Sequence, residues 1–149
     1  MNIKLHARRI DTKMRVAIYA MTEFAMSTLI PSTRLRNNLT INIHLKHHVE
    51  GGEAMLSEFT NPKKPREFKV IVDNYDRTRT NNEWAHDILK TLAHELVHVK
   101  QYVMGELKPS NNGMVWKKTV YAPDTLLDYF QTPYEIEAYG REKGLLLGF

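Results

Sequence analysis

Cysteine is absent from the 149 residues of this chain. Its absence excludes a disulfide framework, a thiolate metal site and a cysteine nucleophile. Any metal ion must therefore be held by histidine, aspartate or glutamate. Long apolar runs are missing as well, because Arg15 and Glu23 interrupt the most hydrophobic stretch, Met14 to Ile30. We expect an amphipathic helix there, and neither a membrane span nor a signal peptide.

The chain also has little excess charge of either sign. Lys and Arg number 21 against 17 Asp and Glu, which gives a net charge of +4. A solvated surface of mixed charge explains this balance. A nucleic-acid patch is the weaker alternative, because no basic segment is interleaved with aromatic residues. The length and an apolar content of 42% predict one globular domain, residues 1–149, in the cytoplasm.

The first half of the chain predicts a helix followed by strands. Apolar residues at helical spacing favour a helix over Met14–Leu29, ended by Pro31. Apolar and polar residues alternate over Leu39–Leu45, which indicates a strand with one buried face. Glu53–Phe59 is a plausible returning strand and Glu67–Asp73 a third. Together these segments predict a three-stranded antiparallel meander.

The second half predicts two helices and therefore an α+β fold. Thr80 and Glu83 have the spacing of a capping box at the start of a long apolar helix, and Gly105 ends that helix. Met114–Tyr121 is a candidate short strand. A last helix is expected over Thr132–Leu147, with Thr132 as its cap and a proline at its first position.

The long helix contains the motif HELVH, in which His94 and His98 lie four residues apart. Residues at this spacing share one helix face, so both imidazoles can bind one Zn²⁺. Glu95 is rotated by about 100° and lies beside the open position of the metal. There it can exchange a proton with an attacking water molecule, which is the chemistry of the H-E-x-x-H metallopeptidases.

A third ligand must come from an acidic residue, because no histidine follows His98. The candidates are Glu135, Glu137 and Glu142 in the last helix. Glu135 and Glu137 face about 200° apart on a helix, so they cannot both reach the metal. Glu137 lies four residues before Arg141, which is typical of an exposed ion pair. Glu135 shares its face with apolar residues and is the favoured ligand, with Glu137 as the alternative.

HELVHVKQY followed by PYEIEAYGRE resembles the gluzincin peptidases, in which HExxH on one helix is completed by a Glu on a later helix. The E-x-x-A pattern of several such families maps to Glu135 and Ala138. The strands, the HExxH helix and MVWKK together also resemble small SprT-like or phage-encoded zinc peptidases, in which case the cytoplasm is that of a host cell. The resemblance spans about Leu39 to Gly140. A Glu stands where SprT proteins have a third His.

The resemblance implies a zinc-dependent peptidase that acts on a peptide or protein, with Glu95 as general base and then acid. The strand Glu67–Asp73 would border the cleft and pair with an extended substrate. Tyr139, Tyr134 and Tyr121 are candidate donors to a transition-state oxyanion. Two alternatives stay open: a zinc-stabilised module without catalysis, and a DNA-associated protease of SprT type.

Overall fold

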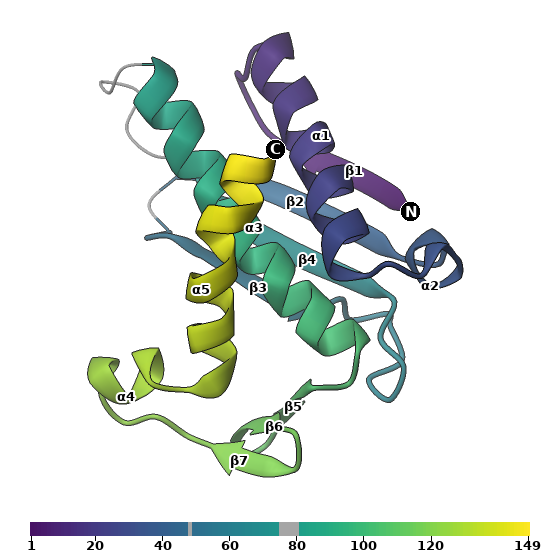
Figure 1. Ribbon diagram of the computed structural model, residues 1–149, viewed down its shortest axis with the longest axis vertical. Helices are drawn as coiled ribbons and strands as arrows, with labels where there is room; N and C mark the ends of the chain where they lie inside the picture. The colour runs from purple at the N-terminus through teal and green to yellow at the C-terminus, as the bar shows by residue number, and fades with distance from the viewer. Residues whose placement is uncertain (48, 75–80) are drawn as a thin grey trace.

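The chain folds into a mixed sheet with helices on one face, followed by a small hairpin region (Figure 1). This computed structural model describes residues 1–47, 49–74 and 81–149. The elements are, in order, β1 (Asn2–His6), α1 (Thr12–Leu29), α2 (Thr33–Asn37), β2 (Thr40–Lys46), β3 (Gly52–Leu56), β4 (Glu67–Asp73), α3 (Asn81–Val103), β5 (Leu107–Ser110), β6 (Gly113–Trp116), β7 (Thr119–Tyr121), α4 (Leu126–Phe130) and α5 (Pro133–Gly148). The predicted α+β class is confirmed.

The main sheet has the strand order β1-β2-β4-β3. Pairing is parallel between β1 and β2 and between β2 and β4, and antiparallel between β4 and β3. The predicted antiparallel meander is therefore wrong, because β4 inserts between β2 and β3 and because β1 adds an unpredicted strand. Alternation along a strand specifies its buried face, but carries no information about its neighbour or its direction.

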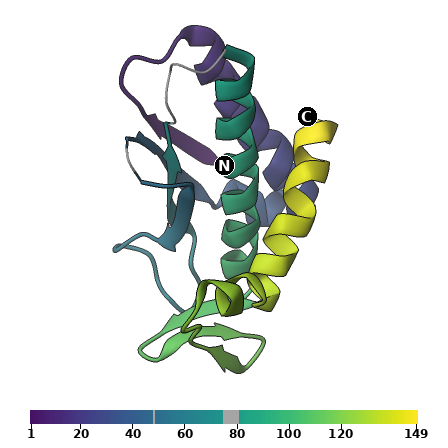
Figure 2. The ribbon, with the colours of Figure 1, turned by 90° about the vertical axis from the view of Figure 1, so that its left-hand side faces the viewer.

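One face of this sheet is buried under the helices, as Figure 2 shows. Buried side chains alternate along the two central strands: Ile41, Ile43 and Leu45 in β2, and Phe68, Val70 and Val72 in β4. Helix α3 lies against β3 and β4 and is flanked by α1 and α5. This layering holds α3 rigidly between the sheet and α5.

Helix α1 confirms the predicted N-terminal helix. The carboxylate of Asp11 caps it by accepting a hydrogen bond of 2.7 Å from the backbone N–H of Met14. The helix ends at Leu29, two residues before Pro31, which cannot continue it. Within the residues that the structure describes, no helix is long and apolar enough to cross a bilayer.

Helix α3 is the longest helix and carries the HELVH motif. The predicted capping box pairs Thr80 with Glu83, and Thr80 lies outside the described residues. At its other end, Gly105 has a φ of 71°, and the N–H of Glu106 bonds back to the carbonyl of Gln101 at 3.0 Å. The glycine therefore ends the helix as predicted.

A small sheet of order β5-β6-β7 and helix α4 connect α3 to α5 (Figure 1). The single strand predicted over Met114–Tyr121 is a hairpin instead, because the chain reverses at Lys117 and Lys118. These residues have φ values of 44° and 78°, the conformation of a tight hairpin turn. Helix α5 then begins after Thr132, with Pro133 at its first position, as predicted.

Candidate metal centre and its cleft

Helix α3 carries three of the predicted site residues on a buried side. His94, Glu95 and His98 are 6%, 5% and 7% exposed. The imidazole rings of His94 and His98 lie 5.0 Å apart between centroids, as expected for neighbours one turn apart. Leu92 and Leu96, both fully buried, fix this part of the helix in the core.

Helix α5 places the carboxylate of Glu135 opposite both histidines. Its Oε1 lies 3.0 Å from Nε2 of His94, and its Oε2 lies 2.9 Å from Nε2 of His98. The donor atoms of these three residues all fall within 4.8 Å of one another, and no other such group of three occurs in residues 1–47, 49–74 and 81–149. The three residues that the sequence favours as ligands therefore come together.

The second nitrogen of each imidazole is held by a residue whose role the sequence analysis did not predict. Nδ1 of His94 lies 2.8 Å from Oε2 of Glu142, and Nδ1 of His98 lies 2.8 Å from Oε1 of Gln101. The amide of Gln101 donates to the Tyr134 carbonyl at 3.0 Å, so its oxygen faces His98. Each Nδ1 is therefore an N–H donor, and each Nε2 can bind a metal once it gives up the proton that it shares with Glu135.

Glu137, the alternative ligand, is directed away from the histidines. It pairs with Arg141 at 3.4 Å, as predicted, and with Lys100 at 3.3 Å. It also accepts a hydrogen bond of 2.9 Å from the amide of Gln101. Its role is to orient Gln101, and through Gln101 the ring of His98.

The clustered groups shift one another's pKa values. Burial raises the pKa of Glu135, but hydrogen bonds from His94 and His98 outweigh burial and bring it down to about 2. Burial lowers the pKa of each histidine, but the hydrogen bonds to Glu135 and the surrounding negative charge make the net shift upward. Burial raises the pKa of Glu95 to about 7, opposed by His98 and His94. A carboxyl group with that pKa can exchange protons at neutral pH.

The donor set fits a divalent cation such as Zn²⁺. Two imidazoles and one carboxylate are a ligand set of tetrahedral sites that keep one position open. Neighbouring donors of a tetrahedral zinc ion lie roughly 3.3–3.4 Å apart. The observed separations of 3.0 Å and 2.9 Å would therefore have to widen only slightly. The hydrogen-bonded Nδ1 atoms already hold the rings in the orientation that such a site requires.

The cluster lies in a cleft between β3 on one side and α4 with the small sheet on the other. A cavity of about 280 Å³ opens on the side of His98, and one of about 380 Å³ opens on the side of His94. Gly52, Glu95 and Tyr129 line both cavities. The groups available for chemistry therefore meet at the middle of an elongated cleft.

Strand β3, at the end of the sheet order, borders this cleft. The carbonyl of Gly51 accepts from Asp73, and the N–H of Ser57 donates to Glu67, so alternate residues of β3 face β4. The peptide groups of Gly52 and Ala54 consequently face the cleft. The prediction that Glu67–Asp73 would pair with a substrate is wrong, because β4 is already paired on both sides.

Gly52 allows β3 to lie directly against α3. A Cβ atom there would come within 2.8 Å of the Ile71 carbonyl, 2.9 Å of Thr91 Cγ2 and 3.0 Å of Glu95 Cγ. Real side chains do not tolerate such contacts, so only glycine fits. Gly52 therefore sets the distance between the edge strand and Glu95.

Five tyrosines line the cleft, and Tyr129, which lines the cavities on both sides of the cluster, was not among the predicted candidates. Burial and the negative charge of Glu135 strongly raise the pKa of its phenol. Of the predicted donors, Tyr139 lies edge-on to His94 at 4.4 Å, whereas Tyr134 and Tyr121 form the wall on the side of His98. No sequence motif marks Tyr129, because helix α4, which carries it, is placed only by the fold.

No known protein family, curated protein or solved structure matches this chain. Function has therefore to be inferred from the arrangement of His94, Glu95, His98 and Glu135 and from the cleft around them.

Proposed function

We propose that the protein is a zinc-dependent peptidase, with His94, His98 and Glu135 as metal ligands and Glu95 as the general base. The observation that supports this most is the convergence of the two Nε2 atoms on the Glu135 carboxylate, with Glu95 beside them. A buried helix that carried this motif by chance would not require a carboxylate from another helix to meet both imidazoles.

Bound Zn²⁺ would polarise the scissile carbonyl and acidify the attacking water. Glu95 accepts a proton from that water and later delivers it to the leaving amine. Its burial at 5% exposure keeps a proton on it transiently at neutral pH. Tyr129 is the proposed donor to the oxyanion, because it lines the cavities on both sides of the cluster together with Glu95.

An extended substrate would add to the sheet at β3, with its peptide groups bonded to Gly52 and Ala54. Antiparallel addition is favoured, because antiparallel pairs are somewhat more stable than parallel pairs. This arrangement would bring the scissile bond near Glu95, because a Cβ atom at Gly52 would come within 3.0 Å of the Cγ of that residue. The substrate is a peptide or an unfolded protein segment, and the proposed setting is the cytoplasm.

The first test is metal content, measured by elemental analysis on wild type, Glu135→Ala and Glu137→Ala. We expect about one zinc per chain in wild type and in Glu137→Ala, and a large loss in Glu135→Ala. Glu137→Ala tests the alternative ligand: it removes an equal side chain from the same helix, and because Glu137 reaches the site only through Gln101 it should weaken zinc binding far less than Glu135→Ala. Absence of stoichiometric metal from all three samples would refute the proposal.

The second test is hydrolysis of a broad peptide pool by wild type and Glu95→Gln at equal zinc content. We expect cleavage by wild type and a loss of activity of at least about 10²-fold in Glu95→Gln. Full zinc occupancy without any cleavage would favour the alternative of a zinc-bearing module without catalysis.

A further inference from the structure

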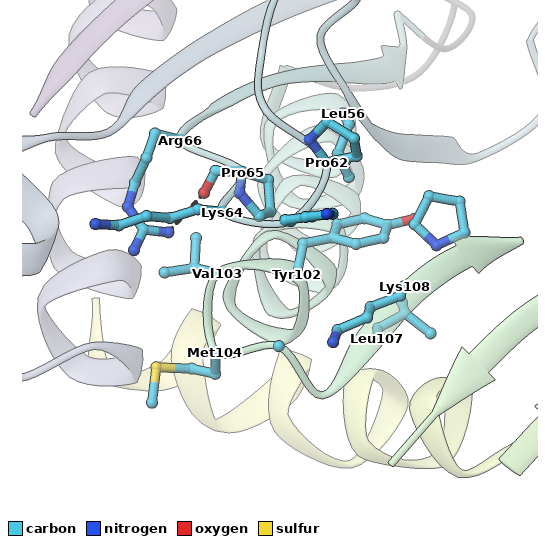
Figure 3. A pocket seen from close by; sticks show the side chains of 13 residues that line it. Leu56, Pro62, Lys64, Pro65, Arg66, Tyr102, Val103, Met104, Leu107 and Lys108 are labelled. Atoms are coloured by element: carbon cyan, nitrogen blue, oxygen red, sulfur yellow. Dashed lines mark hydrogen bonds between the residues drawn. The ribbon is translucent and has the colours of Figure 1, made fainter. Parts of the chain in front are cut away.

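A cationic pocket continues the cleft past the carboxyl end of α3 (Figure 3). Its volume is about 140 Å³, and its cations are Lys63, Lys64, Arg66 and Lys108. Tyr102 and Leu107 line both this pocket and the cavity beside His98. The pocket is therefore the next compartment along the same cleft.

The loop before β4 and the strand β5 supply the charges from opposite sides. Figure 3 shows Lys64 and Arg66 on the loop side and Lys108 on the side of β5, with Tyr102 between them. Within the part of the chain that the structure describes, Lys63, Lys64 and Lys108 form no ion pair. By contrast Lys100, close by on α3, is bound to Glu106 at 2.7 Å and to Glu137.

Apolar and cationic groups are combined in this pocket. Leu56, Val103 and Leu107 form apolar walls, and the lysines are exposed at the rim. A glutamate side chain has the matching composition, with two methylene groups followed by a carboxylate. The cavity at the opposite end of the cleft is lined by Glu50, Asp87 and Glu142, and its lysine, Lys90, is paired with Glu142 at 3.7 Å, so its acidic lining does not favour an anionic side chain. The cleft is thus cationic at the end near β5 and acidic at the end near His94.

We propose that this pocket binds an acidic side chain of the substrate, three or four residues before the scissile bond. This inference rests on the proposed peptidase function. Leu96 lies midway between His94 and His98 in the sequence. At a rise of 1.5 Å per residue, Tyr102 to Met104 lie roughly 9–12 Å farther along α3. An extended peptide covers that distance in about three to four residues at 3.3 Å each. Antiparallel addition to β3 directs the amino-terminal part of the substrate toward Leu56 and the pocket.

The first test measures binding without catalysis, by a two-dimensional ¹⁵N NMR titration with the capped dipeptides acetyl-Glu-Glu-amide and acetyl-Gln-Gln-amide. We expect amide shifts at Lys63, Lys64 and Lys108, with the Glu peptide binding about two- to thirtyfold more tightly from two exposed ion pairs. Lys63→Glu/Lys64→Glu should abolish that difference. Lys4→Glu/Lys13→Glu, which changes two exposed lysines outside the pocket by the same total charge, should retain it.

Equal affinities for the two dipeptides, or shifts confined to other residues, would overturn the proposal. So would a single-stranded oligonucleotide that shifts the same residues at lower concentration than the Glu peptide, because the pocket would then be part of a nucleic-acid site.

The second test sequences the products of a random decapeptide pool cut by the zinc-loaded wild type and the same variants. Aspartate and glutamate should be enriched at least about twofold three or four residues before the cut in wild type and in the control variant. Lys63→Glu/Lys64→Glu should lose the enrichment. Enrichment after the cut, or none, would overturn the proposal. If the dipeptide binds as expected and no peptide is cut, the peptidase function fails and the acidic-ligand pocket stands.

Discussion

Replacement of Gln101 by leucine tests whether the residues behind the histidines control metal affinity. Gln101 is fully buried, and its amide connects His98, the Tyr134 carbonyl and Glu137. Leucine has nearly the same volume and no polar atom. Glu137 would keep Lys100 and Arg141, and the Tyr134 carbonyl would keep its place in the hydrogen-bond ladder of α5, so the substitution leaves one buried group without a partner, the Nδ1–H of His98.

Two separate losses are expected from this change. A buried group left without a partner costs about 1–3 kcal/mol, so the free energy of unfolding should fall by that amount. Loss of the partner that orients a ligating histidine typically weakens metal affinity by about 10–100-fold. At a fixed zinc concentration above Kd, the stabilisation that zinc provides should then shrink by about 1.4–2.7 kcal/mol.

The assay separates the two losses. Urea unfolding with a chelator reports the change in the fold, and competition with a chromophoric chelator reports Kd for zinc. Gln131→Leu is the matched control, because Gln131 is exposed and we expect neither quantity to change. A folded Gln101→Leu protein that binds zinc with the affinity of wild type would refute the assigned role of Gln101.

Three further predictions follow from contacts in and near the cleft. Gly52→Ala should lower the free energy of unfolding by about 1–3 kcal/mol because of its clash with α3, whereas Gly144→Ala, in open space on α5, should raise it by up to about 1 kcal/mol; equal effects in urea titrations would contradict this. Tyr129→Phe should keep its zinc and lose about 10²-fold in kcat, and an unchanged kcat would exclude it as the oxyanion donor. The His44 ring stacks on His6 at 4.3 Å, and burial, His6 and nearby lysines lower the pKa of His44, so the native state binds this proton less readily than the unfolded chain. Stability should therefore decline as pH falls below about 6.5, and less steeply in His44→Gln, a comparison made by urea unfolding at pH 7.5 and 5.

The sequence predicts which residues cluster at the site better than it predicts the sheet. Four-residue spacing on a helix is local information, so His94 and His98 could be assigned to one face before any fold was known. Glu135 could be preferred over Glu137 for a similar reason, because the two face opposite sides of α5 and an arginine offers Glu137 a partner outside the core. The pairing of β4 depends on contacts between distant segments, for which alternation provides no signal.

The residues that support the site could not be assigned for a related reason. Gln101 lies three residues after His98, on a face shared with it, so a weak local signal existed for that contact. Glu142 and Tyr129 reach the cluster only because α5 lies beside α3 and because α4 turns toward it. Such contacts require the docking of whole helices, which single residues do not specify.

The hydrogen bonds of the cluster also bear on whether a bound metal serves catalysis or stability. The two histidines and Glu135 have protein partners: Glu135 bonds both histidines, and Glu142 and Gln101 bond their outer nitrogens. A site that zinc alone holds together unfolds when the ion is removed. Here the side chains satisfy one another, so treatment with a chelator should leave a cooperative thermal transition. The free energy of unfolding should fall only by the contribution of zinc binding, which is about 2.7 kcal/mol at a zinc concentration of 100 times Kd. Calorimetry with and without chelator checks this, and a chelated protein without a transition would instead favour the structural zinc module.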